Sequence, residues 1–358
     1  MPNAPVHPNN PIFRLKKILV VRNDKLGDFM LAYPSFAMLK ENLPSMHVTA
    51  LVPRYTADMA KCCPWIDEVL IDPISEAEKG GIWALTTLFK QKKFDAIIVL
   101  FSTTRVGLAA WLAGVPYRLA PATKVAQVLF NRTVVQRRSE SIQPEHTYNS
   151  DLIKHFLRER GVPEKATIQA PFLKFDAQEV QRLHRAFCAH YQLSTQDKLV
   201  YIHTGSGGSA RNVSSEQFAQ LARALRSQQP FTLVLTAGPN EILAANELAQ
   251  RLKGGAQKVI VYPSQQGLRA FAQHIQFASV FIGGSTGPLH IAGALDVPTA
   301  GFYPRSRVNS SLRWQTLNSP ERRLAFSPDE NADEDDMRTI DMQKAAERIS
   351  TQFLGGKA

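Results

Sequence analysis

The chain has 358 residues, and 42 Lys and Arg against 31 Asp and Glu give it a formal net charge of +11 at pH 7. An apolar content of 44% excludes a disordered chain, and only three cysteines exclude a disulfide scaffold. At about 100–200 residues per domain, this length predicts two domains. The excess positive charge indicates an anionic partner: nucleic acid, a membrane surface or a phosphorylated substrate.

The N-terminal residues 1–14 are rich in Pro and Asn and are expected to form a flexible tail, since they contain no apolar segment typical of a signal peptide. The longest apolar runs are far shorter than the roughly 18 residues that a membrane span needs. We therefore expect a cytoplasmic protein whose contact with the inner membrane surface is peripheral. The three cysteines form no CxxC pair, so no zinc site is expected.

The first half of the chain alternates continuous apolar strands with helical patterns. Such runs are typical of a parallel sheet covered on both faces. This pattern predicts an N-terminal Rossmann-like domain over residues 15–172. Its strands are expected at Lys17–Arg22, His47–Val52, Glu68–Ile71 and Phe94–Phe101, with helices at Asp28–Asn42 and 146–162.

The second half repeats this alternation and predicts a C-terminal Rossmann-like domain over residues 173–338. A Ser-x-x-Gln capping box at Ser214 marks one of its helices. The acidic run at 329–336 is expected to be a solvated loop, and residues 339–358 a final helix that packs back on the N-terminal domain. The expected strands are Leu199–His203, Phe231–Thr236, Lys258–Val261, Ser279–Ile282 and Thr299–Phe302, and the other helices lie at about 177–192, 214–229, 240–252, 268–276 and 288–295.

Two doubly wound α/β domains imply that ligands bind outside the carboxyl ends of the strands, in the cleft between the domains. The first loop at such a strand end contains Gly27 and Asp28. Asp28 in a first helical turn either stabilises the helix N-terminus or acts as a general base.

Two further loops follow strands of the second half. His203–Arg211 is rich in Gly and Ser and ends on a cation suited to a diphosphate, although it matches the dinucleotide fingerprint only weakly. Ser285–Gly287 places amides and hydroxyls before a helix that starts near Pro288, which is either an anion site or a plain connector with a buried His290.

No acidic residue lies between Asp95 and Glu140, a window that holds six basic residues. This window is either a solvated basic face or an electropositive wall for a polyanionic partner. The residues expected to bind this partner, as the acceptor substrate, are Arg105, Arg118 and Arg132 of the window and Lys25 of the first loop.

The segment RNDKLGDFMLAYPSFAMLK, with HTGSGGSARNVSSEQF, TAGPNE and GGSTGPLHIAGALDVPTAGFYP, resembles the lipopolysaccharide heptosyltransferases of glycosyltransferase family 9. The resemblance covers roughly residues 17–315. It implies a GT-B fold of two Rossmann-like domains with an interdomain cleft. It also implies metal-independent, inverting transfer of a sugar, usually heptose from ADP-heptose, to the lipopolysaccharide core.

Under this resemblance Asp28 is the general base that takes the proton of the acceptor hydroxyl. The implied partners are a nucleotide-sugar donor and an anionic glycolipid, with no metal, no other cofactor and no nucleic acid. The implied donor-binding residues are Thr204, Gly205, Ser206, Arg211, Glu241, Ser285, Thr286, Gly287 and His290.

Two positions differ from the family pattern. Position 285 is Ser where heptosyltransferases often carry Asp, and position 211 is Arg where many carry Lys. A transferase using another nucleotide sugar therefore stays an alternative, as does a GT-B nucleotide-sugar epimerase or hydrolase. A further alternative is a non-catalytic protein that binds anionic lipid or nucleic acid. Nucleic acid is disfavoured because few aromatic residues lie among the basic residues of the window.

Overall fold

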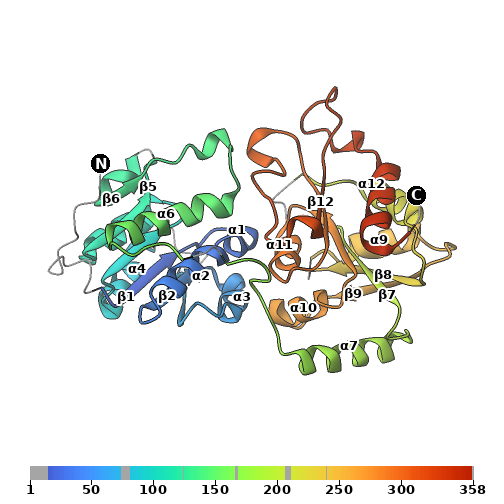
Figure 1. The fold of residues 1–358 in the computed structure, drawn as a ribbon, viewed down its shortest axis with the longest axis horizontal. Helices are drawn as coiled ribbons and strands as arrows, with labels where there is room; N and C mark the ends of the chain where they lie inside the picture. Colours follow the sequence, from blue (N-terminus) through green and yellow to red (C-terminus); the bar gives the residue numbers. More distant parts are fainter. Residues whose placement is uncertain are drawn as a thin grey trace. The chain divides into compact units, whose positions relative to one another are not determined.

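The computed structural model describes residues 15–73, 81–123, 125–165, 168–205, 211–238 and 240–356. They form two compact units, each built on a six-stranded sheet (Figure 1). The first unit contains the described residues up to Arg138 and Gln143–Ile168, and the second contains Ser139–Ile142 and the chain from Gln169. The expected α/β class is confirmed, and the main division falls four residues before the expected one.

The first sheet has the strand order β3-β2-β1-β4-β5-β6, and every neighbouring pair is parallel. This is the Rossmann order, in which the chain direction across the sheet reverses between β1 and β4. Ligands of such sheets bind at the carboxyl ends of these two strands. The strands are β1 (Lys17–Val21), β2 (His47–Val52), β3 (Glu68–Ile71), β4 (Ala96–Val99), β5 (Tyr117–Pro121) and β6 (Arg132–Val134).

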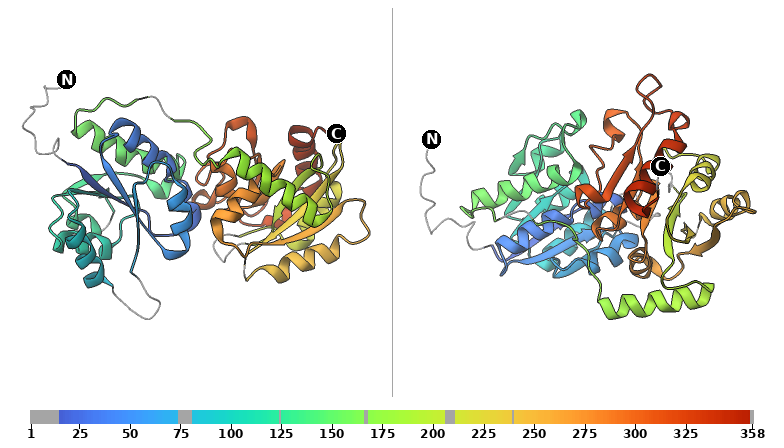
Figure 2. Two further views of the ribbon diagram at one scale, coloured as in Figure 1. Left: turned by 90° about the horizontal axis from the view of Figure 1, so that it is seen from below. Right: turned by 45° about the vertical axis from the view of Figure 1, so that its right-hand side comes forward.

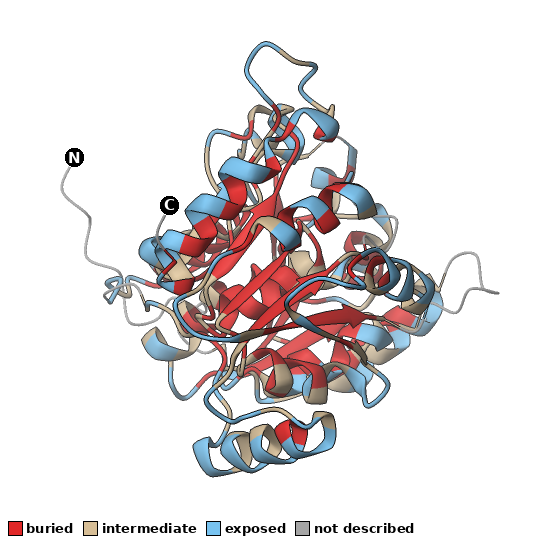
Figure 3. Cartoon of the chain, turned by 90° about the vertical axis from the view of Figure 1, so that its right-hand side faces the viewer, coloured by how far each residue is buried: buried red, intermediate tan, exposed pale blue. Residues whose placement is uncertain are grey.

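Helices cover both faces of the first sheet. Helices α2 (Tyr33–Asn42) and α6 (Glu145–Glu159) lie together on one face, and α4 (Ile82–Lys92) and α5 (Thr104–Leu112) lie on the other (Figure 2, left). The short α3 (Ala57–Cys62) follows β2. The inner strands β1, β2, β4 and β5 are largely buried between these layers, while the edge strand β6 is mostly exposed; Figure 3 draws buried residues in red.

The helix expected over Asp28–Asn42 is instead two helices, α1 (Leu26–Met30) and α2. The break lies at Leu31 and Ala32, just before Pro34 in the first turn of α2. Proline has no N–H and clashes with the preceding turn, so it fits the start of a helix and not its interior.

The second sheet has the order β12-β11-β10-β7-β8-β9, and all its neighbouring pairs are parallel. Numbered from β7, this is again the Rossmann order, with its reversal between β7 and β10. The strands are β7 (Lys198–His203), β8 (Phe231–Ala237), β9 (Lys258–Pro263), β10 (Val280–Gly284), β11 (Thr299–Phe302) and β12 (Arg323–Phe326).

The core of the second unit packs one face of this sheet against three helices, α8 (Ser215–Ala224), α9 (Ile242–Arg251) and α12 (Met342–Ile349). The capping box of Ser214 and Gln217 at the start of α8 is confirmed. The expected packing of the C-terminal helix on the N-terminal domain is wrong for α12. Its apolar residues Met342, Ala345 and Ile349 are buried in the hydrophobic core of the second unit, where α12 packs against α8.

The remaining elements of the second unit complete its surface. Helix α7 (Ala177–Tyr191) packs against α10 (Gly267–Ile275) through a cluster of aromatic rings around Phe187. Helix α11 comprises Gly287–Ala294. Short helical turns occur at Arg54–Thr56 (η2), Val125–Leu129 (η3), Arg138–Glu140 (η4), Arg307–Asn309 (η5), Pro320–Arg322 (η6), Met337–Thr339 (η7) and Ser350–Leu354 (η8).

Candidate active site

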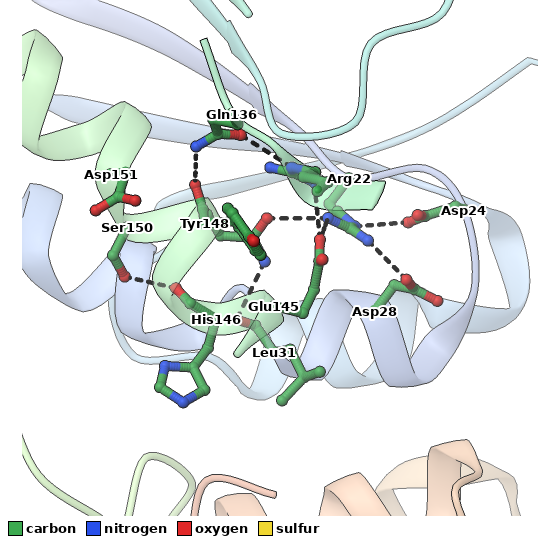
Figure 4. Close-up of polar contacts among 12 residues, drawn as sticks. Arg22, Asp24, Asp28, Leu31, Gln136, Glu145, His146, Tyr148, Ser150 and Asp151 are labelled. Atoms are coloured by element: carbon green, nitrogen blue, oxygen red, sulfur yellow. Dashed lines mark hydrogen bonds and ion pairs between the residues drawn. The ribbon is translucent and has the colours of Figure 1, made fainter. Parts of the chain in front are cut away.

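A network of charged side chains surrounds Asp28 at the carboxyl end of β1 (Figure 4). Arg22 directly follows β1, and its guanidinium is buried. Its Nη2 donates to Asp28 Oδ1 at 2.6 Å, and its Nε donates to Asp24 Oδ1 at 2.8 Å. Asp28 itself lies in the first turn of α1, as expected.

Helix α6 supplies the other side of the network. Arg22 Nη1 donates to Glu145 Oε1 at 2.7 Å and to Asn149 Oδ1 at 2.9 Å. Arg138 also donates to Glu145 Oε1, at 2.8 Å. Sequence reasoning missed Arg22, Glu145 and Asn149 as site residues. The available signal was the pair of polar residues, four positions apart, on the otherwise apolar face of α6.

The Asp28 carboxyl has the electrostatics of a proton acceptor. Burial raises its pKa from 3.8 to about 6, against the opposing attraction of the Arg22 guanidinium. The side chain is still 14% exposed, so a substrate can reach it. Within the described residues only Oδ1 receives a hydrogen bond, which leaves Oδ2 for a substrate proton.

Two of the four expected acceptor-binding residues lie at this end of the sheet. Lys25 is exposed and precedes α1. Arg105, in the first turn of α5, forms an ion pair with the buried Asp72, which also accepts from Asn23 Nδ2. Asp72 therefore links the loops that follow β1, β3 and β4, and Arg105 is held by it.

The other two, Arg118 and Arg132, lie near the starts of β5 and β6, away from the carboxyl ends of these strands. Arg118 donates to the backbone oxygens of Val115 and Leu129, and Arg132 forms an ion pair with Glu159 at 3.1 Å. The structure therefore does not bring these arginines together with Asp28. The acid-free window spreads its cations over both ends of the sheet because β5 and β6 run through it.

In the second unit, polar groups gather at the carboxyl ends of β7 and β10, which are neighbours in the sheet. Thr204 follows β7, and Thr286 and His290 belong to the start of α11. Thr204 Oγ1, Thr286 Oγ1 and His290 Nδ1 are buried and have no hydrogen-bond partner among the described residues. Burial lowers the pKa of His290 to about 4, so its ring is neutral near pH 7.

Buried polar atoms without partners are rare, because each costs about 1–3 kcal/mol. Three such atoms at the switch point of one sheet indicate a binding site for a polar ligand. Ser285, half-buried, and Gly287, the first residue of α11, complete the loop before the helix N-terminus, which favours an anion. Ser206 lies outside the described residues.

Glu241 follows β8, and its side chain packs against Gly205 in the loop after β7. Its carboxylate accepts from the Gly238 amide at 3.0 Å and lies 3.5 Å from His203 Nε2. A Cβ on Gly205 would overlap the Glu241 carboxylate, so a side chain there would displace that carboxylate. His203, whose Nδ1 lies 3.0 Å from Thr236 Oγ1, is a neighbour that sequence reasoning missed.

A second close approach joins the loops after β7 and β10. Asn212 Nδ2 donates to the Thr204 carbonyl at 3.2 Å. A Cβ on Gly284 would lie 2.5 Å from Asn212 Oδ1. Glycine at the end of β10 therefore lets Asn212 brace the backbone that carries Thr204.

Arg211 is 65% exposed and forms an ion pair with Asp335 at 3.4 Å. The acidic run 329–336 also contacts Arg305, whose backbone amide donates to the Glu334 carbonyl at 2.7 Å and whose Nη2 donates to the Ala332 carbonyl at 2.8 Å. The run is a loop of exposed and half-buried residues, as expected. It also contacts these two arginines, although Arg305 Nε has no hydrogen-bond partner among the described residues.

Among the described residues, no group of three or more His, Cys, Asp or Glu side chains could hold a metal ion. None of the helices described is both long enough and apolar enough to span a bilayer.

Comparison with known proteins agrees with this architecture. The family model described as glycosyltransferase family 9 (heptosyltransferase) matches residues 82–333. The chain is 43% identical over 314 residues to a "Putative glycosyltransferase" of Haemophilus influenzae, which covers 88% of this chain and 90% of that protein. It is 22% identical over 292 residues to lipopolysaccharide heptosyltransferase 2 of Salmonella typhimurium, covering 80% and 82% of the two chains.

Among solved structures, the ADP-heptose lipopolysaccharide heptosyltransferase II of Escherichia coli superposes with a TM-score of 0.75 at 19% identity. The match covers 95% of this chain and 99% of that one, and it confirms the GT-B fold. The family match and the Haemophilus relative each extend over most of the chain. The chain therefore belongs to glycosyltransferase family 9 and is a glycosyltransferase of heptosyltransferase type.

Proposed function

We propose that this enzyme transfers heptose from ADP-heptose to the lipopolysaccharide core, without a metal ion and with inversion at the anomeric carbon. The lipopolysaccharide heptosyltransferase of Salmonella typhimurium and the ADP-heptose lipopolysaccharide heptosyltransferase II of Escherichia coli support this choice of donor and acceptor. The acceptor is an anionic glycolipid, so the enzyme would act in the cytoplasm, at the inner membrane surface. The observation that carries the proposal is Asp28, a partly accessible carboxylate with a raised pKa at the switch point of the first sheet.

In the proposed reaction, Asp28 Oδ2 takes the proton from the acceptor hydroxyl as that oxygen bonds to the anomeric carbon. The bond from this carbon to the donor diphosphate breaks, and its electron pair leaves with ADP. A pKa near 6 leaves Asp28 ionised at pH 7.5 and still able to hold a proton, as a general base requires.

The second unit would bind the donor. Thr204, Thr286 and His290 offer hydrogen bonds that the described protein leaves unused, and the α11 N-terminus favours the diphosphate. Arg211 would add a fixed positive charge at the leaving group. These groups supply the charge stabilisation that a divalent cation gives in other transferases.

A two-substrate assay tests this proposal. The full-length enzyme is incubated with ADP-heptose and a truncated, unheptosylated core acceptor, with and without EDTA, and the product linkage is read by NMR. We expect an inverted product with EDTA present, and we expect Asp28→Asn to lose transfer while binding ADP within a few fold of wild type. Full transfer by Asp28→Asn would exclude Asp28 as the base.

A second candidate is transfer of a different sugar, because Ser285 stands where heptosyltransferases often carry Asp. Ser285 lies in the loop between β10 and α11, beside Thr286, whose hydroxyl has no partner among the described residues. A panel of nucleotide sugars, tested with wild type and Ser285→Asp, separates the two candidates. Turnover of another nucleotide sugar by wild type, shifted toward ADP-heptose by the substitution, would favour this second candidate.

A further inference from the structure

The first two turns of α6 carry two polar residues, Glu145 and Asn149, that are buried against the first sheet. Glu145 and Asn149 are 1% and 0% exposed, and they lie one turn apart on a face that continues with Leu152 and Phe156. Burying a carboxylate costs several kcal/mol unless it is paired and hydrogen-bonded. A helix that only had to cover the sheet would carry apolar residues at these positions.

Both residues bind the arginine that holds Asp28. Glu145 Oε1 and Asn149 Oδ1 accept from Arg22 Nη1, while Arg22 Nη2 donates to Asp28 at 2.6 Å. Building on the proposed function, we propose that Glu145 and Asn149 are positioning residues of the transferase, which fix the Arg22 guanidinium so that it holds Asp28 for proton transfer.

The geometry of the guanidinium gives this arrangement its precision. Arginine presents its donors in a rigid planar fork. Here each of its three nitrogens faces a different partner: Nε faces Asp24, Nη1 faces α6, and Nη2 faces Asp28. Fixing Nε and Nη1 fixes the plane, and therefore the place where Nη2 meets the Asp28 carboxylate. Asn149 Nδ2 also donates to the Leu31 carbonyl at 3.3 Å, which ties α6 to the end of α1.

The charges around Asp28 give this role a measurable sign. The groups that face it are Arg22 and Asp24 from the loop after β1 and Glu145 from α6, with Tyr55 of η2 nearby. Arg138 of η4 reaches the network through Glu145. The negative charges of Glu145 and Asp24 raise the pKa of Asp28, and Arg22 lowers it.

Two substitutions of similar shape change this balance in opposite directions. Glu145→Gln removes a negative charge and lets Arg22 act more fully on Asp28, so the Asp28 pKa should fall. Asn149→Asp adds a negative charge that competes for Arg22, so the Asp28 pKa should rise. A change at a neighbouring charge typically moves a pKa by about 1 or more.

The experiment measures kcat/KM of the full-length enzyme from pH 4.5 to 8.5. We expect the midpoint of the acid limb of the kcat/KM profile to fall by about 1 pH unit in Glu145→Gln and to rise by a similar amount in Asn149→Asp. We expect kcat to fall about tenfold in both, because the base is displaced, while the donor KM stays within a few fold. Glu164→Gln is the matched control, because Glu164 lies beyond the far end of α6 and pairs only with Arg158 among the described residues.

Several outcomes would overturn the proposal. Acid limbs and kcat values equal to wild type would show that α6 does not act on Asp28, and equal shifts in the same direction would show a general loosening of the fold. If Glu145→Gln does not fold, as judged by its circular dichroism, Asn149→Asp alone decides between a shift and none.

A second measurement keeps this inference separate from the proposed function. The Asp28 carboxyl is titrated by carbon-13 NMR, with Asp28→Asn used to assign its signal. Opposite shifts of this titration in the two variants support the coupling even if wild type transfers no heptose, which would refute only the proposed function. Unchanged titrations beside normal heptose transfer would refute only the positioning role.

Discussion

Replacing Asp28 by asparagine removes the proposed base while keeping its shape and its place in the first turn of α1. A positioned general base typically contributes 10²–10⁴-fold to a rate, so we expect kcat to fall by about that factor at pH 7.5. The binding of ADP should change little, because the groups proposed to bind the donor belong to the second unit. This combination separates loss of chemistry from loss of binding.

The same substitution should make the protein more stable near neutral pH. The Asp28 pKa of about 6 lies about two pH units above its ordinary value of 3.8, so the charged form costs about 3 kcal/mol of folding free energy. The folded chain binds this proton more tightly than the unfolded chain does. Stability therefore falls as the pH rises from about 4 to 6, and the full cost is present above pH 6. The attraction of Arg22 is already contained in this balance.

Thermal unfolding of wild type and Asp28→Asn between pH 5 and 8 measures this effect. One kcal/mol moves the Tm of a domain of 150–250 residues by about 2–4 °C, so the variant should melt several degrees higher at pH 7.5. The gain should shrink as the pH falls below 6. A variant that melts lower than wild type at pH 7.5, with a deficit that narrows in acid, would refute the argument from burial.

Four further predictions concern both units. The acid limb of kcat/KM in wild type should lie near pH 6, with activity falling about tenfold for each pH unit below it; a flat profile down to pH 5 would contradict the Asp28 assignment. Arg211→Ala should raise the donor KM about tenfold or more, whereas Asp335→Asn should lower it at most two- to threefold, because the exposed ion pair between them is weak. Gly205→Ala should weaken ADP binding several-fold in calorimetry, since the added Cβ displaces Glu241 from the Gly238 amide. Thr286→Val should stabilise the free protein by about 1 kcal/mol and weaken ADP binding about tenfold; unchanged values would show that the hydroxyl meets no ligand.

The order of strands and helices could be predicted where the sequence pattern was strong. Runs such as Leu199–His203 and Phe231–Thr236 are continuous and apolar, which is typical of buried parallel strands, and each lies within an observed strand. The loops at their ends follow from the same pattern, so Asp28, Thr204 and Thr286 could be predicted as candidate site residues. The helix break before Pro34 shows where the pattern fails, because an apolar stripe can continue through two short helices.

The partners of these residues could not be predicted, because they come from distant parts of the chain. Arg22 and Glu145 are separated by 123 positions, and Arg211 and Asp335 by 124. A local pattern shows that Arg22 follows a strand, but only the packing of α6 on the sheet shows what the guanidinium meets. The acidic run 329–336 is a solvated loop as predicted, but its contacts with Arg211 and Arg305 could not be predicted from the local pattern.

The network around Arg22 also explains why Asp28, among three neighbouring carboxylates, is suited to take the proton. Glu145 accepts from both Arg22 and Arg138 and is 1% exposed, so two cations stabilise its charge and a substrate cannot reach it. The Asp24 side chain is more exposed than that of Asp28, at 22% against 14%. Asp28 is buried enough for its pKa to rise, is held by one arginine nitrogen at one oxygen, and stays 14% exposed. With two cations and three anions in the network, a proton on Asp28 neutralises one surplus negative charge. Proton transfer from the acceptor therefore relieves the electrostatic cost of the site, which is the property that a base in a buried position needs.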